Sequence, residues 1–588
     1  MRIFALNCGS SSLKSVLIDT VTRERLLEMR IENLASADCR LLVGSESRSM
    51  DAKDTHGAIQ QLFAELQSRL PENSPVEAVA HRIVHGGADF VQPTLLDDAV
   101  TTAIAKLNDL APLHNPFALE AATFARVQMP QVPHVAVFDT AFHATLPARA
   151  KHYALPAEVS SRFGIRRYGF HGTSHSQVTR SIAQHLGTQP QLLRIVSCHL
   201  GNGASVAAVE YGRSVETSMG MTPLEGLVMG TRCGDVDPGA LLYLLQHGGY
   251  DGSSLNELLN NGCGLKGLTG TNDLRSIERR AEQGDETCRL AIALYAHRVR
   301  KYIGAYAAVM GGVDVIVFTG GIGENSALMR HRILQRFDFL GARLDEDSNR
   351  DVQVSPTQPI SELGEAGMRT RLFVVSANEE LEIALQAAAL LAGRAVADTI
   401  PIPVEISARH AHLTQATIET LFGAGYQLRE RSRLSQSGQF SAAETVALVG
   451  PRGRIDKVRL MGPPRTMDQV EISRSDEFLL GVDAPVRISG DLRNTPGITL
   501  EGPAGRTTIA SGVICARRHI HMDPPNARRL GLSDHDSVQV RIDSDGRDLV
   551  FSDVVVRVAE GFELRLHLDT DEANAAGVKQ GDTCELVR

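Results

Sequence analysis

The stretch "RIFALNCGSSSLKSVLID" (residues 2–19) consists of an apolar run, a turn of small residues and a second apolar run. This pattern predicts a β-hairpin whose turn exposes backbone N–H groups and hydroxyls, with Asn7 and Lys14 beside it. The stretch "RIVSCHLGNGASVAAVE" (194–210) repeats the design around "GNG". Two matching hairpins favour a duplicated α/β fold with a nucleotide cleft between its halves.

A third turn lies in "VDVIVFTGGIGENS" (313–326), which predicts a buried strand, a glycine turn and a helix from about Asn325. Glycine lets a phosphate approach the backbone, and N–H groups at such turns bind anions. None of the three turns is a Walker A loop, because no Gly-Lys-Ser/Thr follows the glycines. Each turn alone could be an ordinary tight turn, whereas three together favour nucleotide binding.

Composition narrows the class of protein. A chain of 588 residues with 43% hydrophobic residues predicts two or three globular domains. No apolar run reaches the roughly 18 residues of a membrane span, and the start turns polar too soon for a signal peptide. The net charge of −9 argues against nucleic acid as the main partner. Eight scattered cysteines without a C-x-x-C pair favour the reducing cytoplasm over a disulfide framework.

The composition changes after "SANEELEIALQAAALLAG" (376–393), which predicts a helix. Ser376 is the expected cap, Glu379 the expected partner in a capping box, and Gly393 the expected stop. Prolines and β-branched residues follow, in short alternating runs typical of strands. We therefore expect a first domain over 1–396, a linker over 397–401 and a mostly β, barrel-like domain over 402–588.

Charged groups occur in several glycine-containing loops of the first domain. An Arg or His in a loop is often a solvated or structural group, but a glycine-rich loop after a buried strand favours a site. We expect Asp139, after the apolar run "VAVF", to lie in the cleft and not in a core ion pair. The other candidates are Arg82 in "HRIVHGG", His171 in "RRYGFHGTSH", Arg232 in "MGTRCGDVDPG" and Asp273 in "TGTNDLR".

These segments, with "NCGSSSLK", "FDTAFH", "HLGNGAS", "TSMGMTPLEGLVMGTRCGDVDPG" and "TGGIGENS", resemble the acetate kinase family in the family's order across nearly all of residues 1–393. The resemblance implies the actin-like, sugar-kinase-type fold, two related α/β halves with ATP between them. It departs from the family at Glu216, where Asp is usual, and at Cys233, which replaces a common Ser; neither is assigned to chemistry.

Site residues follow from the resemblance at matching positions. The implied Mg²⁺ ligands are Asn7 and Glu379. The implied substrate-binding residues are Arg82, His114 and Arg232. The implied catalytic residues are Asp139, His171 and Arg232, the last two beside the transferring phosphoryl group. The implied nucleotide contacts are Lys14, His199, Leu200, Gly201, Asn202, Gly203, Asp273, Leu274, Arg275, Gly320, Gly321, Ile322, Gly323, Glu324 and Asn325.

The second domain carries one cluster twice, in "SARHAHLTQAT" (407–417) and "CARRHIHMDPP" (515–525). In a strand, residues i and i+2 point to the same face, so each H-x-H can offer two imidazoles to one metal, most often zinc. Glu471 and His567 are available as further ligands. A single H-x-H could be a pair of satisfied histidines; two in matching contexts favour two related half-domains that share a metal site.

The segments "VEISARHAHL", "MGPPRTMDQVEIS", "VICARRHIHM" and "LHLDTDEAN" resemble the phosphate propanoyltransferase family over about 402–588. The resemblance implies two small pseudo-symmetric β-barrels with two zinc ions between them. The implied zinc ligands are His410, His412 and Glu471 for one ion and His519, His521 and His567 for the other. Arg465 is the implied catalytic arginine. No segment resembles the family's encapsulation peptide, which adds to the expectation of a cytoplasmic protein.

Together the resemblances imply a bifunctional enzyme. One half would interconvert acyl-CoA and phosphate with acyl phosphate and CoA, and the other would interconvert acyl phosphate and ADP with carboxylate and ATP. We expect a homodimer through the kinase half, and neither nucleic acid nor membrane as a partner. Propionate or butyrate could replace acetate, since one methylene discriminates by only about 1–3 kcal/mol. Alternatively, the C-terminal half is an inactive CoA- or metal-sensing module that regulates an active kinase.

Overall fold

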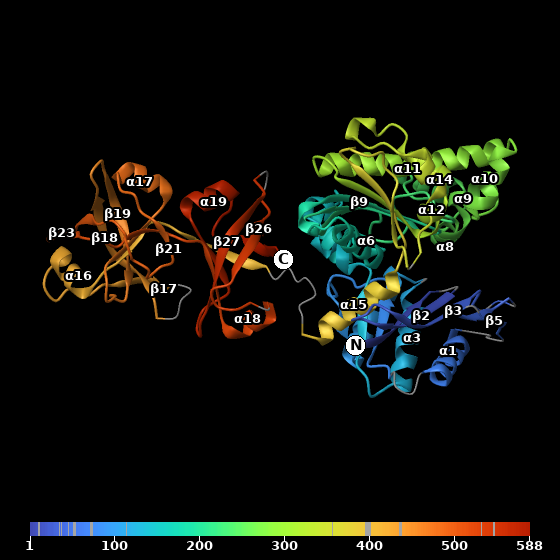
Figure 1. The fold of residues 1–588 in the computed structure, drawn as a ribbon, viewed down its shortest axis with the longest axis horizontal. Helices are drawn as coiled ribbons and strands as arrows, with labels where there is room; N and C mark the ends of the chain where they lie inside the picture. The colour runs from blue at the N-terminus through green and yellow to red at the C-terminus, as the bar shows by residue number, and fades with distance from the viewer. Residues whose placement is uncertain are drawn as a thin grey trace. The chain divides into compact units, whose positions relative to one another are not determined.

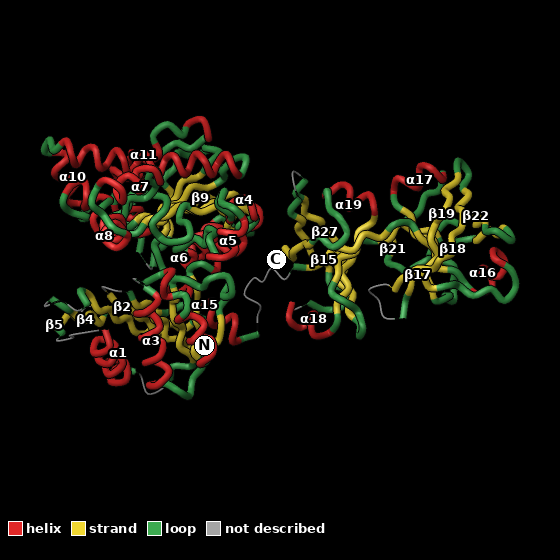
Figure 2. The backbone as a smooth tube through the Cα atoms, turned by 180° about the vertical axis from the view of Figure 1, so that it is seen from behind, coloured by secondary structure: helices red, strands yellow, loops and turns green. Residues whose placement is uncertain are grey.

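The computed structural model describes the chain except residues 10–11, 35, 37, 45, 51–54, 71–74, 113, 356, 394–400, 434–437, 531, 545–546 and 588. It divides into two compact units, Met1–Ala392 and Gly393–Arg588 (Figure 1). The first mixes helices and strands, and the second consists mostly of strands (Figure 2). Most of the predicted linker at 397–401 lies outside the described residues, as does the Ser10–Ser11 turn.

The N-terminal unit contains two sheets built on one plan. In the first sheet the order is β5-β4-β3-β2-β1-β6-β8-β7; β1 is antiparallel to β2 and parallel to β6, and β6 is parallel to β8. Its strands are β1 (Arg2–Cys8), β2 (Ser12–Asp19), β3 (Arg25–Glu32), β4 (Arg40–Val43), β5 (Glu46–Ser49), β6 (Ala78–Ile83), β7 (Thr94–Leu95) and β8 (His134–Phe138).

The second sheet repeats the pattern in the order β11-β10-β9-β12-β14-β13. Here β9 is antiparallel to β10 and parallel to β12, which is parallel to β14. Its strands are β9 (Arg194–Leu200), β10 (Ala204–Glu210), β11 (Arg213–Thr217), β12 (Val315–Thr319), β13 (Ile360–Glu362) and β14 (Arg371–Val375). The duplicated fold and both hairpins predicted from the sequence are thus confirmed.

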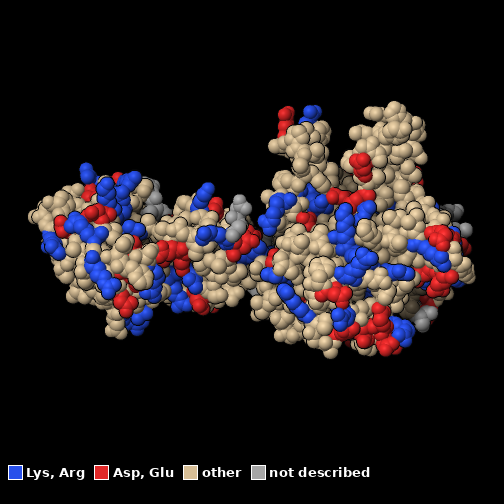
Figure 3. Space-filling view, turned by 90° about the horizontal axis from the view of Figure 1, so that it is seen from above, with Lys and Arg blue, Asp and Glu red and all other residues tan. Residues whose placement is uncertain are grey.

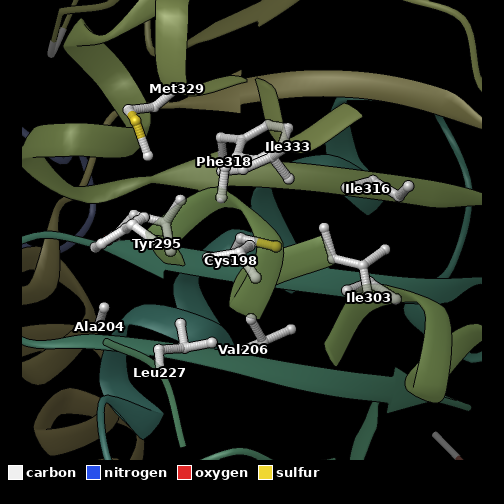
Figure 4. Close-up of a cluster of buried hydrophobic side chains, with 14 of the residues drawn as sticks. Cys198, Ala204, Val206, Leu227, Tyr295, Ile303, Ile316, Phe318, Met329 and Ile333 are labelled. Carbon is white, nitrogen blue, oxygen red and sulfur yellow. The ribbon is translucent and has the colours of Figure 1, made fainter. Parts of the chain in front are cut away.

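Helices bury both faces of the second sheet. On one face, Tyr295 and Ile303 of α11 (Glu286–Val309) pack with Val206 and Phe318 of the sheet (Figure 4). On the other, Val178 of α6 (Gly172–His185) packs against sheet residues. The other α-helices of the unit, apart from α15, are α1 (Thr55–Arg69), α2 (Asp98–Ala105), α3 (Asn115–Gln128), α4 (Ala148–Lys151), α5 (Ala157–Phe163), α7 (Pro238–His247), α8 (Gly252–Glu257), α9 (Gly264–Thr269), α10 (Leu274–Glu282), α12 (Gly320–Asn325), α13 (Ala327–Leu334) and α14 (Glu346–Asp351).

The last helix of the unit, α15 (Glu379–Leu391), returns from the second sheet to the first. Ile383 and Ala387 pack against Ile3 and Val137, so the end of the unit completes the core around its beginning. Its start differs from the sequence prediction. The helix begins at Glu379, so Asn378, not Ser376, caps it by accepting a hydrogen bond from Leu381 N at 3.4 Å. Ser376 lies before the helix, where its backbone N–H donates to Pro359 O.

The glycine turn after β12 contains a short helix that the sequence did not predict. Among its glycines only Gly320 adopts the left-handed conformation (φ +78°), and Gly320–Asn325 form α12. The helix expected from about Asn325 is α13, which begins at Ala327. Ser326 then caps α13, and its hydroxyl accepts from Met329 N at 3.0 Å.

The C-terminal unit contains one closed barrel and one open sheet. The barrel order is β15-β28-β25-β27-β26-β29; the open sheet runs β21-β24-β20-β16-β19-β18-β22-β23, with β17 beside β18. The second barrel implied by the resemblance is therefore only a half-barrel, since β21 and β23 remain at its two ends. The strands are β15 (Ile402–Ser407), β16 (His410–His412), β17 (Glu430–Arg433), β18 (Phe440–Val449), β19 (Arg454–Gly462), β20 (Gln469–Ile472), β21 (Val486–Arg487), β22 (Ile498–Glu501), β23 (Arg506–Ile509), β24 (Val513–Ala516), β25 (His519–Met522), β26 (Ser537–Ile542), β27 (Leu549–Val558), β28 (Arg565–Asp569) and β29 (Thr583–Val587).

The two halves nevertheless share a pairing pattern around their histidines. Strand β16 lies parallel to β19 and antiparallel to β20, and β25 lies parallel to β27 and antiparallel to β28. The strand before each H-x-H crosses to the other half, since β15 pairs with β28 and β24 with β20. A helix follows each of four strands: α16 (Gln415–Phe422), α17 (Arg474–Leu480), α18 (Pro524–Leu530) and α19 (Thr570–Ala576).

Over the described part of the chain, no helix is both long and apolar enough to cross a bilayer. All eight cysteines carry free thiols. Acidic and basic side chains are mixed on the visible surface of each unit (Figure 3). Anionic substrates must therefore be held by cations gathered locally at the sites.

We expect each unit to fold alone. Dividing the chain between Ala397 and Asp398 should give two soluble fragments whose melting temperatures lie within about 4 °C of the transitions of the whole chain. Differential scanning calorimetry of the three proteins tests this. A fragment ending at Val375 is the control, because it lacks α15 and exposes the apolar residues that α15 covers; it should not fold. Fragments that fail to fold at the first boundary would contradict independent units.

Candidate active sites

The first site begins where neighbouring parallel strands of the first sheet end. Arg82 lies on β6, and Asp139 directly follows β8. The guanidinium of Arg82 pairs with both carboxylate oxygens of Asp139, with Nε donating to Oδ1 at 3.1 Å, and Thr173 Oγ1 donates to the same oxygen at 2.8 Å. Asp139 is fully buried. The expectation of a carboxylate outside a core ion pair was therefore wrong, because parallel pairing brings Arg82 against it.

Arg82 also contacts both predicted Mg²⁺ ligands, Asn7 and Glu379. Its Nη1 donates to Asn7 Oδ1 at 3.0 Å, and Nε lies 3.7 Å from Glu379 Oε2. The amide oxygen comes from β1 and the carboxylate from the start of α15. Oxygen donors of this kind are those that Mg²⁺ prefers, so the residues present fit the ion.

His171 and Arg232 meet at the GNG hairpin. His171 stands at the start of α6 with φ +56°, and its ring stacks on that of His199 with centroids 4.4 Å apart. A Cβ built on Gly203 would lie 3.3 Å from His171 Nε2 and 3.7 Å from Arg232 Nη1. Both groups therefore converge on the backbone of Gly203, where only a glycine leaves room for a third group.

Arg232 differs from Arg82 in its partners. Its hydrogen-bond acceptors among the described residues are Pro223 O at 3.4 Å and the sulfur of Met229 at 3.8 Å, and no described carboxylate forms an ion pair with it. Burial lowers its pKa. Burial also lowers the pKa of His114 to about 4, and the charges of Arg232 and Arg82 add to this effect. A half-buried guanidinium without a carboxylate is suited to bind an anion.

The predicted nucleotide contacts form two groups. His199, Leu200, Gly201, Asn202 and Gly203 belong to the β9–β10 hairpin, and Gly320 to Asn325 form α12; a Cβ on Gly320 would lie 2.8 Å from Leu200 O, so the two groups touch. Glu324 Oε1 accepts from Gly320 N at 2.9 Å and from Ala377 N at 3.1 Å, which holds the turn in shape. Lys14 is exposed.

The remaining contacts lie at the start of α10. Asp273 and Arg275 are exposed and pair with each other at 3.2 Å. The side chain of Leu274 belongs to the core, so only its backbone can face a ligand. Nothing in the geometry assigns these three residues to the nucleotide, and they stay predictions.

The second site comprises two groups of three side chains in the C-terminal unit. His410 lies opposite Glu471 on paired strands, with His412 two residues on; His519 lies opposite His567, with His521 two residues on. In each group the possible ligand atoms lie within 4.8 Å of one another. Except for the half-buried His519, these side chains are buried.

The hydrogen bonds around the groups fit a metal. Nδ1 of His410 lies 2.9 Å from Ala408 O, and Nδ1 of His519 lies 2.8 Å from Arg517 O. A carbonyl only accepts, so each Nδ1 carries the proton and each Nε2 keeps its lone pair for a ligand. Nε2 of His567 is buried without a partner. A zinc ion with nitrogen and carboxylate ligands would satisfy these atoms.

Glu471 is oriented by residues that the sequence did not single out. Its Oε1 accepts from Gln469 Nε2 at 2.5 Å and from Ser489 Oγ at 2.9 Å, which leaves Oε2 facing His410 Nε2 at 3.6 Å. Nη1 of Arg465 reaches Ser489 Oγ at 3.4 Å, so the predicted catalytic arginine lies beside this group. Burial lowers the pKa of Arg465.

The two groups share one cavity of about 30 Å³, lined by His410, Glu471, His519 and His567 among others. Matched ion pairs flank it. Arg409 lies 3.1 Å from Asp476, and Arg518 lies 2.7 Å from Glu572; each arginine immediately precedes an H-x-H. The strands that cross between the halves bring both groups to the same cavity. The sequence analysis predicted this juxtaposition from two related half-domains.

Arg557 was also missed from the sequence. It pairs with His521 on adjacent parallel strands, and its charge contributes to the lowered pKa values of His519 and His521, which burial mainly causes. Arg557 thus places a cation beside the His519–His521–His567 group, as Arg465 does beside the group that contains Glu471. Only the pairing of β25 with β27 brings it there, and no local motif marks it.

Comparisons with known proteins agree with this division. Residues 2–385 match the acetokinase family model, and residues 403–579 match that of phosphate propanoyltransferase. The acetate kinase of Clavibacter michiganensis subsp. michiganensis is 46% identical over 403 residues, covering 66% of this chain and 99% of that protein. That of Thermotoga maritima is 43% identical over 394 residues, covering 65% and 97%.

Solved structures resemble the N-terminal unit. A propionate kinase from Francisella tularensis subsp. tularensis aligns with TM-score 0.61 and 36% identity, covering 66% of this chain and 98% of that one. The acetate kinase of Porphyromonas gingivalis aligns with TM-score 0.61 and 36% identity, covering 66% and 99%. Each covers the actin-like part of the fold.

Because Asp139 is buried against Arg82, Asp139→Asn should reduce both activity and stability. Removing one partner of a buried ion pair costs about 3–5 kcal/mol, which would lower the melting temperature of the N-terminal unit by roughly 4–6 °C. Acetyl phosphate synthesis and calorimetry measure the two effects. Asp98→Asn is the control, since Asp98 pairs with Arg126 at an exposed position. A variant that is inactive at unchanged melting temperature would contradict the buried-pair argument.

Proposed function

The chain belongs to the acetokinase family and also carries a phosphate propanoyltransferase domain, which makes it a kinase and a phosphotransacylase, and we propose that an acyl phosphate links the two reactions. The C-terminal unit would transfer the acyl group from CoA sulfur to phosphate. The N-terminal unit would then transfer the phosphoryl group to ADP, giving carboxylate and ATP. The observation that carries this proposal is that one chain contains both a guanidinium without a carboxylate partner at the glycine turn of Gly203 and two clusters of three side chains that could each hold a metal.

In the kinase unit, Arg232 and His171 are proposed to bind the transferring phosphoryl group at Gly203. Phosphoryl transfer depends on in-line placement and on neutralised oxygen charge more than on covalent help. Arg232 suits this role because its charge is not already compensated by a carboxylate. His114, held neutral by burial, can bind a substrate oxygen without adding charge. Asn7 and Glu379 would hold Mg²⁺, which offsets the charge of the nucleotide phosphates.

Arg82 and Asp139 are proposed to act as a unit. Their ion pair fixes the guanidinium at the edge of the first sheet, where Nη1 and Nε also meet Asn7 and Glu379. This arrangement supports a role in orienting the carboxylate substrate and the Mg²⁺ ligands together. Neutralising Asp139 would release Arg82 from that position.

In the C-terminal unit, the proposed zinc ligands are His410, His412 and Glu471, with His519, His521 and His567 for the second ion. Zinc with an open position supplies Lewis acidity and binds a thiolate or phosphate oxygen. Arg465 and Arg557 are proposed to hold phosphate and to stabilise negative charge on the acyl oxygen. Gln469 and Ser489 keep Glu471 oriented toward its ion.

A coupled assay tests the whole proposal. The purified chain should form ATP from acetyl-CoA, phosphate and ADP, and omission of any one of them should stop the reaction. Comparison of acetyl-CoA, propionyl-CoA and butyryl-CoA gives the acyl preference, for which we propose acetyl first and propionyl second. If the C-terminal unit were only a CoA- or metal-sensing module, no acyl phosphate would form; the complete ligand sets and Arg465 favour catalysis.

The kinase unit is proposed to form a homodimer through the surface around α7. Every side chain of this helix is at least partly exposed, including Leu242, Tyr243 and Leu245 at 57%, 64% and 40%. Apolar residues gathered on one exposed helix are typical of a protein interface. Light scattering after size-exclusion chromatography gives the mass in solution.

Arg232→Ala should reduce kinase activity by about 10³–10⁵-fold and leave acyl transfer unchanged, because no other described guanidinium replaces it at Gly203. Acetyl phosphate formation from acetate and ATP measures the kinase, and CoA release from acetyl-CoA and phosphate measures the transferase. Arg289→Ala is the matched control, since Arg289 pairs with Glu286 on the surface of α11. A loss below about tenfold would contradict the role of Arg232.

His412→Ala should remove about one metal ion of an expected two per chain and stop acyl transfer, because two remaining ligands hold zinc weakly. His521→Ala should do the same at the other position. Kinase turnover in excess Mg²⁺ should not change in either variant, since that unit uses oxygen ligands. Metal analysis by mass spectrometry and both assays test this.

His535→Ala is the control for both metal variants, since His535 is exposed and pairs with Asp534. An active chain without any transition metal would overturn the metal assignment. Full acyl transfer by His412→Ala would do so as well.

A further inference from the structure

A chain of hydrogen bonds runs behind His171 into the core of the N-terminal unit. Nδ1 of His171 lies 2.9 Å from Ser205 Oγ, and Ser205 Oγ lies 2.8 Å from Nε2 of His175. Nδ1 of His175 in turn lies 2.9 Å from Ser197 Oγ. Ser197, Ser205 and His175 are fully buried, so none of them can exchange its partner for bulk water.

The packing of α6 on the second sheet builds this chain. His171 directly precedes the helix in the left-handed conformation, and its carbonyl accepts from the backbone N–H of His175 at 3.0 Å, so the two residues lie one turn apart at the start of α6. Ser197 lies on β9 opposite Ala207, and Ser205 lies on β10 opposite His199. Residues two apart share a face of a strand, so Ser197, His199 and Ser205 all point to the side covered by α6. Serines from two strands thus alternate with histidines from one helix.

Counting protons shows which groups donate and which accept along this row of hydrogen bonds. Burial holds the pKa of both His171 and His175 well below the usual value, so each ring is neutral with one N–H. Ser205 has one hydroxyl proton and two imidazole neighbours, so it donates to one and accepts from the other. Only two arrangements of the whole chain satisfy this condition.

In the first arrangement Ser197 donates to Nδ1 of His175, Nε2–H of His175 donates to Ser205, and Ser205 donates to Nδ1 of His171. His171 then carries its proton on Nε2, toward Gly203 and Arg232. In the second arrangement every donor and acceptor is reversed, and Nε2 of His171 is a bare acceptor. The second arrangement is unfavourable at Ser197. Its hydroxyl proton would have no acceptor, because His175 is the only hydrogen-bond partner of Ser197 Oγ among the described residues. An unsatisfied buried O–H is unfavourable, so the first arrangement prevails.

We propose that Ser197, His175 and Ser205 form a relay of positioning residues that fixes His171 as the neutral Nε2–H tautomer, a hydrogen-bond donor to the transferring phosphoryl group. The inference rests on the proposed kinase function of this unit. It explains how a histidine without charge can serve at an anion site: it offers a proton that cannot shift to the other nitrogen without breaking bonds in the core. His199 is held separately, by Ser174 Oγ at 2.7 Å from its Nδ1.

The first test observes the tautomer directly. In the full-length chain labelled with ¹⁵N-histidine, long-range ¹H–¹⁵N spectra at pH 7.5 distinguish a protonated Nε2 from a protonated Nδ1, and His171→Gln identifies the signals of His171. We expect the proton on Nε2. A proton on Nδ1 would overturn the relay. This readout does not depend on catalysis, so absent kinase activity would refute the proposed function and leave the tautomer result intact.

The second test breaks the relay. Ser205→Ala removes the hydroxyl between the rings and should lower kcat for ATP formation from acetyl phosphate by about 10- to 100-fold, the value of one hydrogen bond to a charged group. The KM for ADP should stay within about twofold. Ser205→Thr keeps the hydroxyl and should restore kcat to within about threefold of the parent chain. A purely structural role would instead lower the melting temperature and change KM and kcat together.

Ser181→Ala is the matched control, because Ser181 lies on the same helix and bonds Gln177, outside the relay. An unchanged kcat in folded Ser205→Ala would overturn the proposal, as would failure of Ser205→Thr to exceed Ser205→Ala. If Ser205→Ala does not fold, the parent tautomer and the activity of Ser205→Thr still decide: a proton on Nδ1, or a threonine variant that folds but has lost activity, would count against the relay.

Discussion

Burying a polar atom without a partner is costly, and at the two sites paired and unpaired groups lie close together. Arg82 is neutralised by Asp139, whereas Arg232 has only weak neutral acceptors. Nδ1 of His410 is used by a backbone carbonyl, whereas Nε2 of His567 has no partner. An unpaired buried group destabilises the fold by about 1–3 kcal/mol, and a bound ligand that pairs with it offsets this loss. Unpaired buried atoms also occur away from the sites, for example Tyr295 Oη and Gln191 Oε1, so such an atom points to a site only where other ligand-type side chains converge on it.

Much of this plan could be predicted from the sequence. The two hairpins, the duplication and the paired histidines all follow from local periodicity, since hydrophobic alternation and the i, i+2 rule act within a strand. The prediction that failed at the first site concerns a contact between distant segments. The environment of Asp139 follows from the parallel pairing of β6 and β8, which no local rule contains. The cap at Asn378 is a smaller error of two residues in a helix boundary, since asparagine is also a preferred cap.

The residues that the sequence missed have the same origin. Ser489, in the turn after β21, and Arg557, on β27, approach the two histidine clusters only through the tertiary fold, and Ser205 reaches His175 only because α6 packs on the second sheet. Part of the signal is local: "HGTSH" places two histidines one turn apart at the start of a helix, and "SCH" places Ser197 and His199 on one strand face. Which helix covers which strands is a property of the whole fold, and that step lies beyond single-sequence patterns.

The C-terminal unit shows how duplication can make two halves inseparable. Each H-x-H strand belongs to its own half, but the strand before it crosses to the other half. There β15 pairs with β28, which carries His567, and β24 pairs with β20, which carries Glu471. Without one half, the strand of the other half that carries Glu471 or His567 would therefore lose a paired neighbouring strand. The arginine before each H-x-H pairs with a carboxylate on the helix that follows the Glu471 or His567 strand: Arg409 with Asp476 of α17 and Arg518 with Glu572 of α19. A single half thus lacks both the second cluster of three side chains and a strand that supports its own cluster, so the shared cavity between them requires the H-x-H strand twice.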